Sequence, residues 1–111
     1  MAFMSILNQH VGPLPITTTF TAPSDGPACF VLSGSVWSQT ANQMIGVTLE
    51  VDGAAVGAAA IFSNGVSTHR AVVPSYIPVT LKIGAHKITL VASNTATISD
   101  GNDKFDLGFL Y

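Results

Sequence analysis

The stretch "MIGVTLEVDGAAVGAAAIF", Met44–Phe62, decides the fold of this chain. Two runs of alternating side chains flank the dipeptide Asp52-Gly53. Asp-Gly favours a two-residue type I′ turn, because both central positions of that turn need positive φ angles. The stretch therefore predicts a hairpin of two antiparallel β-strands.

One face of this hairpin is predicted to pack against the core, because side chains two residues apart share a face of a strand. The residues expected on the core face are Ile45, Val47, Leu49, Val51, Ala54, Val56, Ala58, Ala60 and Phe62. The opposite face of the second strand includes Gly57 and Ala59, and it is small and apolar where a solvated sheet would be polar. We expect Gly57 and Ala59 to be covered by another copy of the chain or by a loop.

The rest of the chain also has the composition of a β protein. Gly, Pro, Thr, Ser and Val recur at short spacing between turn signals. Further strands are predicted at Ile16–Ala22, Ala28–Trp37, Arg70–Val73, Val79–Ile83, His86–Ala92 and Lys104–Tyr111. A length of 111 residues suits one domain, so we expect a single domain over 1–111 with an N-terminal arm over 1–15. Eight short strands predict an all-β, antiparallel β-sandwich of the jelly-roll type.

Charge is scarce in this sequence. Apolar residues make up 48% of the chain and charged residues 9%, where about a quarter is usual. The net charge of −2 provides no basic field for nucleic acid and no polybasic patch for a membrane surface. So few charges protect a lone monomer poorly against association, and we expect the chain to bind copies of itself.

The N-terminal sequence predicts no signal peptide, because "MAFMSILNQH" lacks a basic start and a long apolar stretch. No run of apolar residues approaches the length needed for membrane insertion. A soluble protein is expected, and its localisation stays unknown. A virion-associated location or export by a non-classical route both remain open.

Four segments resemble the C1q and tumour-necrosis-factor-like jelly-roll family. "TTTFTAPSDGPACFVLSGS" (Thr17–Ser35) is similar to the early strands of that family, and "IGVTLEVDGAAVGAA" to its middle hairpin. "VTLKIGAHKITLVA" (Val79–Ala92) and "FDLGFLY" (Phe105–Tyr111) are similar to its later strands. The resemblance extends over about residues 16–111. It implies a jelly roll whose last strand lies mid-sheet, beside the first strand.

The same resemblance implies a homotrimer, because in that family this sheet faces a threefold axis. It places Asp106, Gly108 and Leu110 toward the neighbouring chains. One position departs from the family pattern, which has an aromatic residue where this chain has Asp106. Either the strand contains a bulge there, or three carboxylates would approach one another, which like-charge repulsion opposes.

One stretch has the composition of a calcium loop, namely "SDGND", Ser99–Asp103. Asp100, Asn102 and Asp103 offer hard oxygen ligands, and Gly101 permits a sharp turn. The same residue types are common turn formers, and we favour a plain turn. No cofactor is therefore expected, with Ca²⁺ as the alternative.

Trp37 and Tyr76 are the candidates for stacking on a sugar ring, because their flat apolar faces suit the C–H faces of sugars. Gln39 and Asn42, in the polar loop after Trp37, could bind hydroxyl groups. The alternative for Trp37 is a core position at the end of a strand.

Catalysis is not expected. His10, His69 and His86 are far apart and have no ligand spacing, so each is predicted to be structural. No Ser, Cys or Thr lies in the context of a nucleophile elbow. Most of the six acidic residues lie in predicted turns, which leaves no clear pair of carboxylates.

The sequence as a whole predicts a non-catalytic binding or recognition domain. Three copies would present surface sites for a carbohydrate or a protein, so that weak sites gain avidity. The expected partners are the chain itself and a cell-surface glycan or protein. Two alternatives remain: a structural subunit of a phage-like or secreted assembly, and a carbohydrate-binding module of the kind attached to enzymes.

Overall fold

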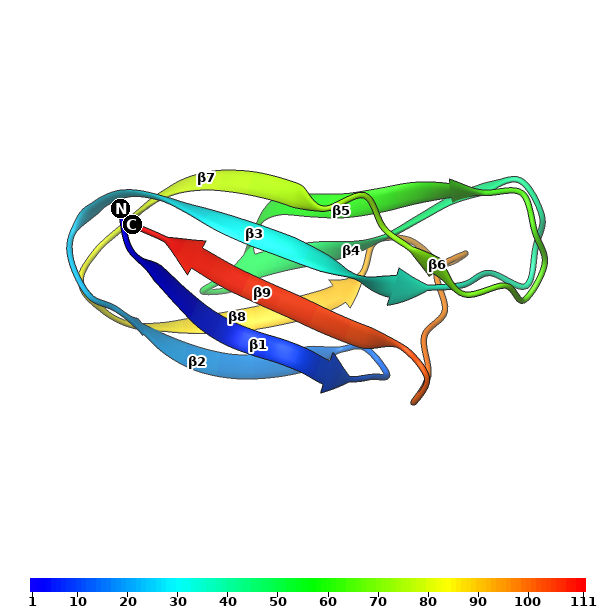
Figure 1. Cartoon of the computed structure of the whole chain (residues 1–111), viewed down its shortest axis with the longest axis horizontal. Coiled ribbons are helices and arrows are strands. Elements are labelled where there is room, and N and C mark those ends of the chain that lie inside the picture. The colour runs from blue at the N-terminus through cyan, green and yellow to red at the C-terminus, as the bar shows by residue number, and fades with distance from the viewer.

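Nine antiparallel strands and no helix make up the structure, a computed structural model that describes all 111 residues (Figure 1). The strands are β1 (Phe3–Val11), β2 (Ile16–Ala22), β3 (Gly26–Val36), β4 (Gln43–Val51), β5 (Ala54–Ser63), β6 (Arg70–Ala71), β7 (Ser75–Leu81), β8 (Gly84–Ala92) and β9 (Lys104–Leu110). The predicted all-β class is confirmed. A helix with the length and hydrophobicity to cross a membrane does not occur in it.

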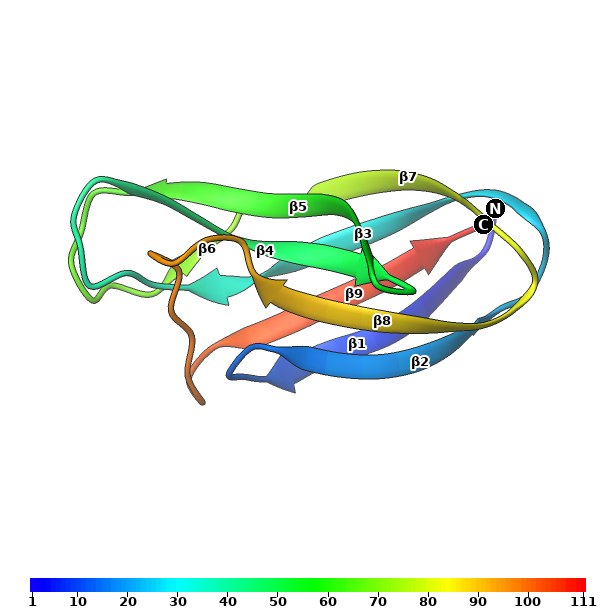
Figure 2. The same ribbon diagram turned by 180° about the vertical axis from the view of Figure 1, so that it is seen from behind.

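The strands form two sheets packed face to face. Sheet one has the order β1-β9-β3-β6, with β7 also paired to β3, and sheet two has the order β2-β8-β4-β5. The chain passes from one sheet to the other between β1 and β2, β2 and β3, β3 and β4, β5 and β6, β7 and β8, and β8 and β9. Figure 2 shows sheet two in front, with β8 between β2 and β4. This alternation between two antiparallel sheets is that of a jelly roll.

The last strand lies in the middle of its sheet, as predicted. β9 pairs with β1 along one edge and with β3 along the other. Phe105, Leu107 and Phe109 point into the sandwich and are fully buried. The ring of Tyr111 stacks on Phe109 with centroids 5.7 Å apart, but 38% of the residue is exposed.

The turn of the predicted hairpin is confirmed. Asp52 and Gly53 have φ angles of 53° and 86°, as a type I′ turn requires. On β4, the four predicted core residues are buried: Ile45, Val47, Leu49 and Val51.

The predicted core face of β5 is wrong, because a β-bulge changes the register. Leu49 lies opposite Gly57 but Glu50 lies opposite Ala55, so Val56 is an extra residue on β5. One extra residue turns every later side chain to the other face of a strand. Beyond the bulge, the β5 residues on the core side are Gly57, Ala59 and Ile61.

Gly57 and Ala59 consequently do not form an outer surface. Ala59 is 1% exposed. A Cβ atom on Gly57 would come within 2.8 Å of the Ile77 side chain on β7, in the opposite sheet. The interface expected at these two residues is corrected to a close approach between the two sheets.

Residues 1–15, for which the sequence predicts an arm, contain β1. This strand pairs with β9 from Phe3 to Val11, with register shifts after Ser5 and after Leu7. The shifts break the alternation of side chains that marks a strand in a sequence. The N-terminal segment is therefore the edge strand of sheet one.

Candidate functional site

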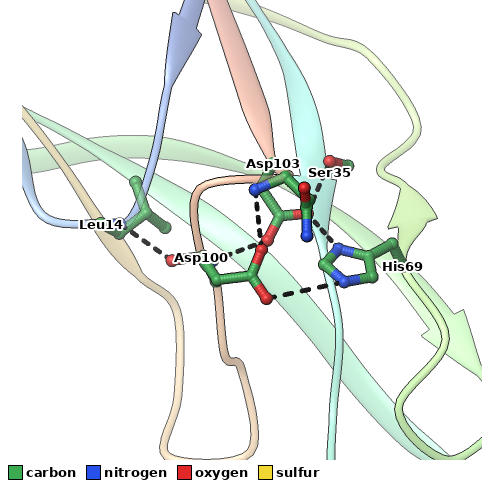
Figure 3. A network of polar contacts seen from close by, with 7 residues as sticks. Leu14, Ser35, His69, Asp100 and Asp103 are labelled. Carbon is green, nitrogen blue, oxygen red and sulfur yellow. Dashed lines mark hydrogen bonds and ion pairs between the residues drawn. The ribbon is translucent and has the colours of Figure 1, made fainter.

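Four polar residues meet at one end of the sandwich and are called the His69 cluster here: Ser35, His69, Asp100 and Asp103 (Figure 3). β3 brings them together. Ser35 lies on β3, His69 immediately precedes β6, and Asp103 immediately precedes β9. Both β6 and β9 pair with the end of β3, so residues far apart in the sequence become neighbours.

Asp103 is the centre of the cluster and is 0% exposed. Its Oδ1 accepts a hydrogen bond from the Ser35 hydroxyl at 2.7 Å and lies 2.6 Å from Nδ1 of His69. Its Oδ2 accepts from the backbone N–H of Asp100 at 2.8 Å. A buried carboxylate needs such partners, because its desolvation is otherwise very costly.

His69 lies between two carboxylates. Its Nδ1 faces Asp103, and its Nε2 lies 3.7 Å from Oδ2 of Asp100. The hydrogen bond to Asp103 raises the pKa of His69 above its ordinary value; burial opposes this, and the charges of Asp103 and Asp100 add to it. The imidazolium form therefore offsets the charge of the buried Asp103. The ring of Trp37 lies beside it, with ring centroids 5.8 Å apart.

The loop Ser99–Asp103 folds as a turn held by its own side chains. Oδ1 of Asp100 accepts from the backbone N–H of Asn102 at 2.8 Å, and the N–H of Asp103 donates to the carbonyl of Asp100 at 3.1 Å. Ser99 accepts from the backbone N–H of Leu14 at 2.8 Å, which ties the loop to the β1–β2 connection.

The donor set of the His69 cluster fits calcium poorly. One ligand atom from each of His69, Asp100 and Asp103 lies within 4.8 Å of the others. Ca²⁺ takes about six to eight oxygen ligands, whereas this group offers two carboxylates and a ring nitrogen. Both oxygens of Asp103 already accept hydrogen bonds. The positive charge beside the two carboxylates is therefore better supplied by the imidazolium form of His69 than by a calcium ion.

We therefore expect no response to calcium. The melting temperature should be the same in excess chelator as in excess Ca²⁺, because a ligand that binds the native state would raise it by mass action. Differential scanning fluorimetry in the two buffers measures this. A rise with Ca²⁺ that Asp100→Asn abolishes would contradict the plain-turn interpretation.

The cluster does not have the order of a nucleophile triad. In such a triad the imidazole takes the proton of the hydroxyl. Here the Ser35 hydroxyl donates to Asp103, and His69 contacts the same carboxylate from another side. The geometry supports structural cross-linking of β3, β6 and β9.

The residues predicted to bind a sugar do not form one site. Trp37 is half-buried at the end of β3, and its Nε1 is buried without a hydrogen-bond partner. Gln39 and Asn42 are exposed in the loop that follows. Tyr76 lies opposite Val31, six residues along β3 from Trp37, which is about 20 Å at the usual rise of a strand. Trp37, Gln39 and Asn42 therefore lie at one end of the sandwich, and Tyr76 lies apart from them.

Tyr76 belongs to a second feature, the outer face of sheet one. The register places ten outward residues side by side on β1, β9, β3 and β7: Phe3, Ser5, Cys29, Val31, Ser33, Tyr76, Pro78, Asp106, Gly108 and Leu110. We call these ten residues the outer face. Asp106 is the one charged residue among these ten, Lys104 lies at the end of the same face on β9, and Phe3 is 62% and Tyr76 is 68% exposed.

The opposite surface of the sandwich is polar over β2, β8 and the end of β4, whereas its β5 edge is apolar, with Met44 55% and Phe62 47% exposed. The outward positions of β2, β8 and β4 include Thr17, Thr19, Thr21, Lys87, Thr89, Thr48 and Glu50. The two sheets therefore differ in what they present to solvent. Threonine hydroxyls and the charges of Lys87 and Glu50 suit water, and a nearly uncharged face with exposed aromatic rings does not.

A hollow of about 340 Å³ lies on the outer face, between β1, β9 and β3. Asp106 lines it, and its Oδ1 accepts from the backbone N–H of Gln9 at 2.8 Å. Gln9 has a φ of 46° and lies at the second register shift of β1. The bulge suggested by the sequence departure is thus on β1, and Asp106 hydrogen-bonds to it.

The three β9 residues expected to face neighbouring chains are all on this face. Asp106 and Leu110 are half-buried, and Gly108 is covered by Phe3, whose ring occupies the place of a glycine Cβ. Their contact with other chains stays a prediction.

Solved structures with the same arrangement of strands were found, whereas no family model and no curated protein sequence matches the chain. Eiger TNF from S. frugiperda superposes with a TM-score of 0.60 at 10% identity, over 97% of this chain and 83% of that one. A family 35 carbohydrate-binding module from Clostridium thermocellum gives 0.56 at 17% identity, over 91% and 72%. The chain has the C1q/tumour-necrosis-factor-like jelly-roll fold.

A third similar structure is dimeric latent PorU from Porphyromonas gingivalis, with a TM-score of 0.61 at 12% identity. The match covers 97% of this chain but only 12% of PorU. The jelly roll is thus similar both to small proteins and to a small part of a much larger one. At these identities the likeness concerns the fold, and one fold supports many functions.

Proposed function

We propose that this chain is a non-catalytic binding domain that acts as a homotrimer assembled through the outer face. The observation that carries the proposal is the contrast between the outer face and the polar surface of β2 and β8. The outer face has one charge among ten positions and two exposed aromatic rings, Phe3 and Tyr76. The cores of protein interfaces are depleted in charge and enriched in aromatic residues in the same way.

The location of the outer face also supports assembly. It lies on the sheet that holds β9, which is the sheet that the family resemblance turns toward a threefold axis. Asp106 does not oppose this proposal strongly, because one of its oxygens is already bound to the backbone of β1. Three copies around one axis would present three ligand sites in one direction and gain avidity.

The test is the mass in solution. We expect light scattering after size exclusion to give about three times the chain mass of 11.5 kDa at micromolar concentration. Phe3→Glu and Tyr76→Glu should shift the mass to that of one chain, because a buried unpaired charge opposes association. Thr19→Glu, on the polar outer surface of sheet two, is the matched control and should leave the assembly intact.

Either of two results would contradict the assembly. A wild-type chain that stays monomeric at micromolar concentration would do so directly. Equal dissociation by Thr19→Glu would show that the charge acts on the fold and not on the outer face.

For the ligand, we propose a carbohydrate or protein surface bound by the end of the sandwich that holds Trp37, Gln39 and Asn42. A glycan array distinguishes the candidates. Specific binding that Trp37→Ala abolishes favours recognition, either as a separate domain or as a carbohydrate-binding module. A blank array with a stable trimer favours a structural subunit of a larger assembly.

A further inference from the structure

A second histidine that contacts a carboxylate lies at the opposite end of the sandwich from the His69 cluster. His86 is on β8, just after the turn that carries the chain from β7 in sheet one to sheet two. Its side chain is 11% exposed. The ring packs against Phe20 of the core, with centroids 5.8 Å apart. His86 is therefore fixed in place by packing as well as by polar contacts.

Both ring nitrogens of His86 lie against hydrogen-bond acceptors. Nδ1 is 2.7 Å from Oδ2 of Asp52, in the β4–β5 turn. Nε2 is 2.7 Å from the backbone carbonyl of Lys82, in the β7–β8 turn. A neutral imidazole has a single N–H and can donate to only one of these acceptors, whereas the imidazolium ion donates to both.

The Asp52 end of this bridge is held independently. Oδ1 of Asp52 accepts from the backbone N–H of Lys87 at 2.9 Å, and the N–H of Asp52 donates to the Lys87 carbonyl at 2.8 Å. The β7–β8 turn is held on its other side by Asp25, whose Oδ1 accepts from the N–H of Ile83 at 2.7 Å. The charged residues around the two turns are thus Asp52 and Asp25, together with Lys82 and Lys87, whose backbone groups take part in these hydrogen bonds.

We propose that His86 is a pH-operated clasp between the β4–β5 turn and the β7–β8 turn. The clasp is closed when the imidazolium donates to Asp52 and Lys82 together. Loss of the proton leaves one acceptor without a donor, so one of the two turns is released. The crossover between the two sheets is then less firmly held.

The pKa shifts of His86 and Asp52 have the directions that the clasp requires. The hydrogen bond to the Lys82 carbonyl raises the pKa of His86, the bond to Asp52 and its charge raise it further, and burial opposes them. The pKa of Asp52 is lowered mainly by its bond to His86. A raised folded-state pKa gives stability that is fully present below the ordinary value of about 6.5 and lost as the pH rises through the raised value.

The clasp is tested by NMR titration of the full chain. We expect the ring protons of His86 to titrate above pH 6.5, and the backbone amide of Lys87 to follow with the same midpoint. Asp52→Asn should lower the midpoint, because it removes the charge of the acceptor. Lys82→Gln is the matched control, since it changes the side chain and keeps the carbonyl, and should leave the midpoint nearly unchanged.

Equilibrium unfolding at pH 5 and pH 9 gives a second measurement. Each unit by which folding raises the pKa reduces the folding equilibrium constant about tenfold across this range. His86→Gln should remove the part of the pH dependence of the folding equilibrium constant that comes from His86. A His86 midpoint at or below pH 6.5, or a Lys87 amide that does not follow it, would overturn the clasp even if the variants fail to fold.

Discussion

Replacing Phe109 with alanine is expected to lower the free energy of unfolding by about 3–5 kcal/mol. Phe109 is fully buried at the centre of the core, with its ring 5.0 Å from those of both Phe20 and Phe30. A typical domain is stable by about 5–15 kcal/mol, so this single change removes a large share of the total. Urea denaturation measures the loss.

Deletion of the last four residues, Gly108–Tyr111, should abolish soluble expression. Those residues pair with β1 on one side and with β3 on the other, so their removal opens the middle of sheet one. Tyr111→Ala is the control, because that side chain is partly exposed and should cost far less than Phe109. If the shortened chain were to melt like the full one, the central position of β9 would be wrong.

Replacing Asp103 with alanine is expected to cost roughly 3 kcal/mol, since hydrogen bonds to a charged group contribute about 1.5–3 kcal/mol each and lost partners stay unpaired. The change leaves Ser35, His69 and the N–H of Asp100 without their acceptor. Asp25→Ala is the matched control, because the exposed Asp25 accepts one backbone hydrogen bond. Equal losses in the two variants would argue against a special role for the buried carboxylate.

The cost of Asp103→Ala should depend on pH. The Asp103 hydrogen bond raises the folded-state pKa of His69. The stability from this bond is complete below the ordinary histidine pKa of about 6.5, and it is lost as the pH rises through the raised value. The difference between wild type and variant should therefore be larger at pH 5 than at pH 9. A difference that does not change with pH would mean that Asp103 acts without His69.

The hairpin Met44–Phe62 shows how far the sequence predicts the fold. Alternation gave the correct core face of β4, and Asp52-Gly53 gave the correct turn. The face of β5 was wrong because Val56 is a bulge among small residues, and no large side chain marks the point where the alternation changes. β1 was not predicted for the same reason, because two register shifts interrupt the alternation of its side chains. Local patterns predict strands and turns, but a one-residue shift in pairing is decided by contacts between strands.

The candidate site was predicted only in part. Asp100 and Asp103 were singled out by their loop, and both belong to the His69 cluster, while Asn102 is exposed and its backbone N–H donates to Asp100. His69 was expected to be structural, but its partner could not be predicted, because 34 residues separate it from Asp103. Only the pairing of β6 and β9 with β3 brings the two together. The outer face was anticipated at Asp106, Gly108 and Leu110, whereas Gly57 and Ala59 were wrongly expected on an outward surface.

The two ends of the chain meet at one corner of the molecule (Figure 1). Ala2 and Tyr111 exchange backbone hydrogen bonds of 2.6 and 3.0 Å, at the point where β1 starts and β9 finishes. A pulling force between the termini would act across the first of these bonds and reach the next only after it breaks. β1 would therefore separate from β9 one hydrogen bond at a time, at low force, although β9 is central to the core. The buried side chains of β9 therefore govern its resistance to heat, whereas the backbone hydrogen bonds between β9 and β1 govern its resistance to tension.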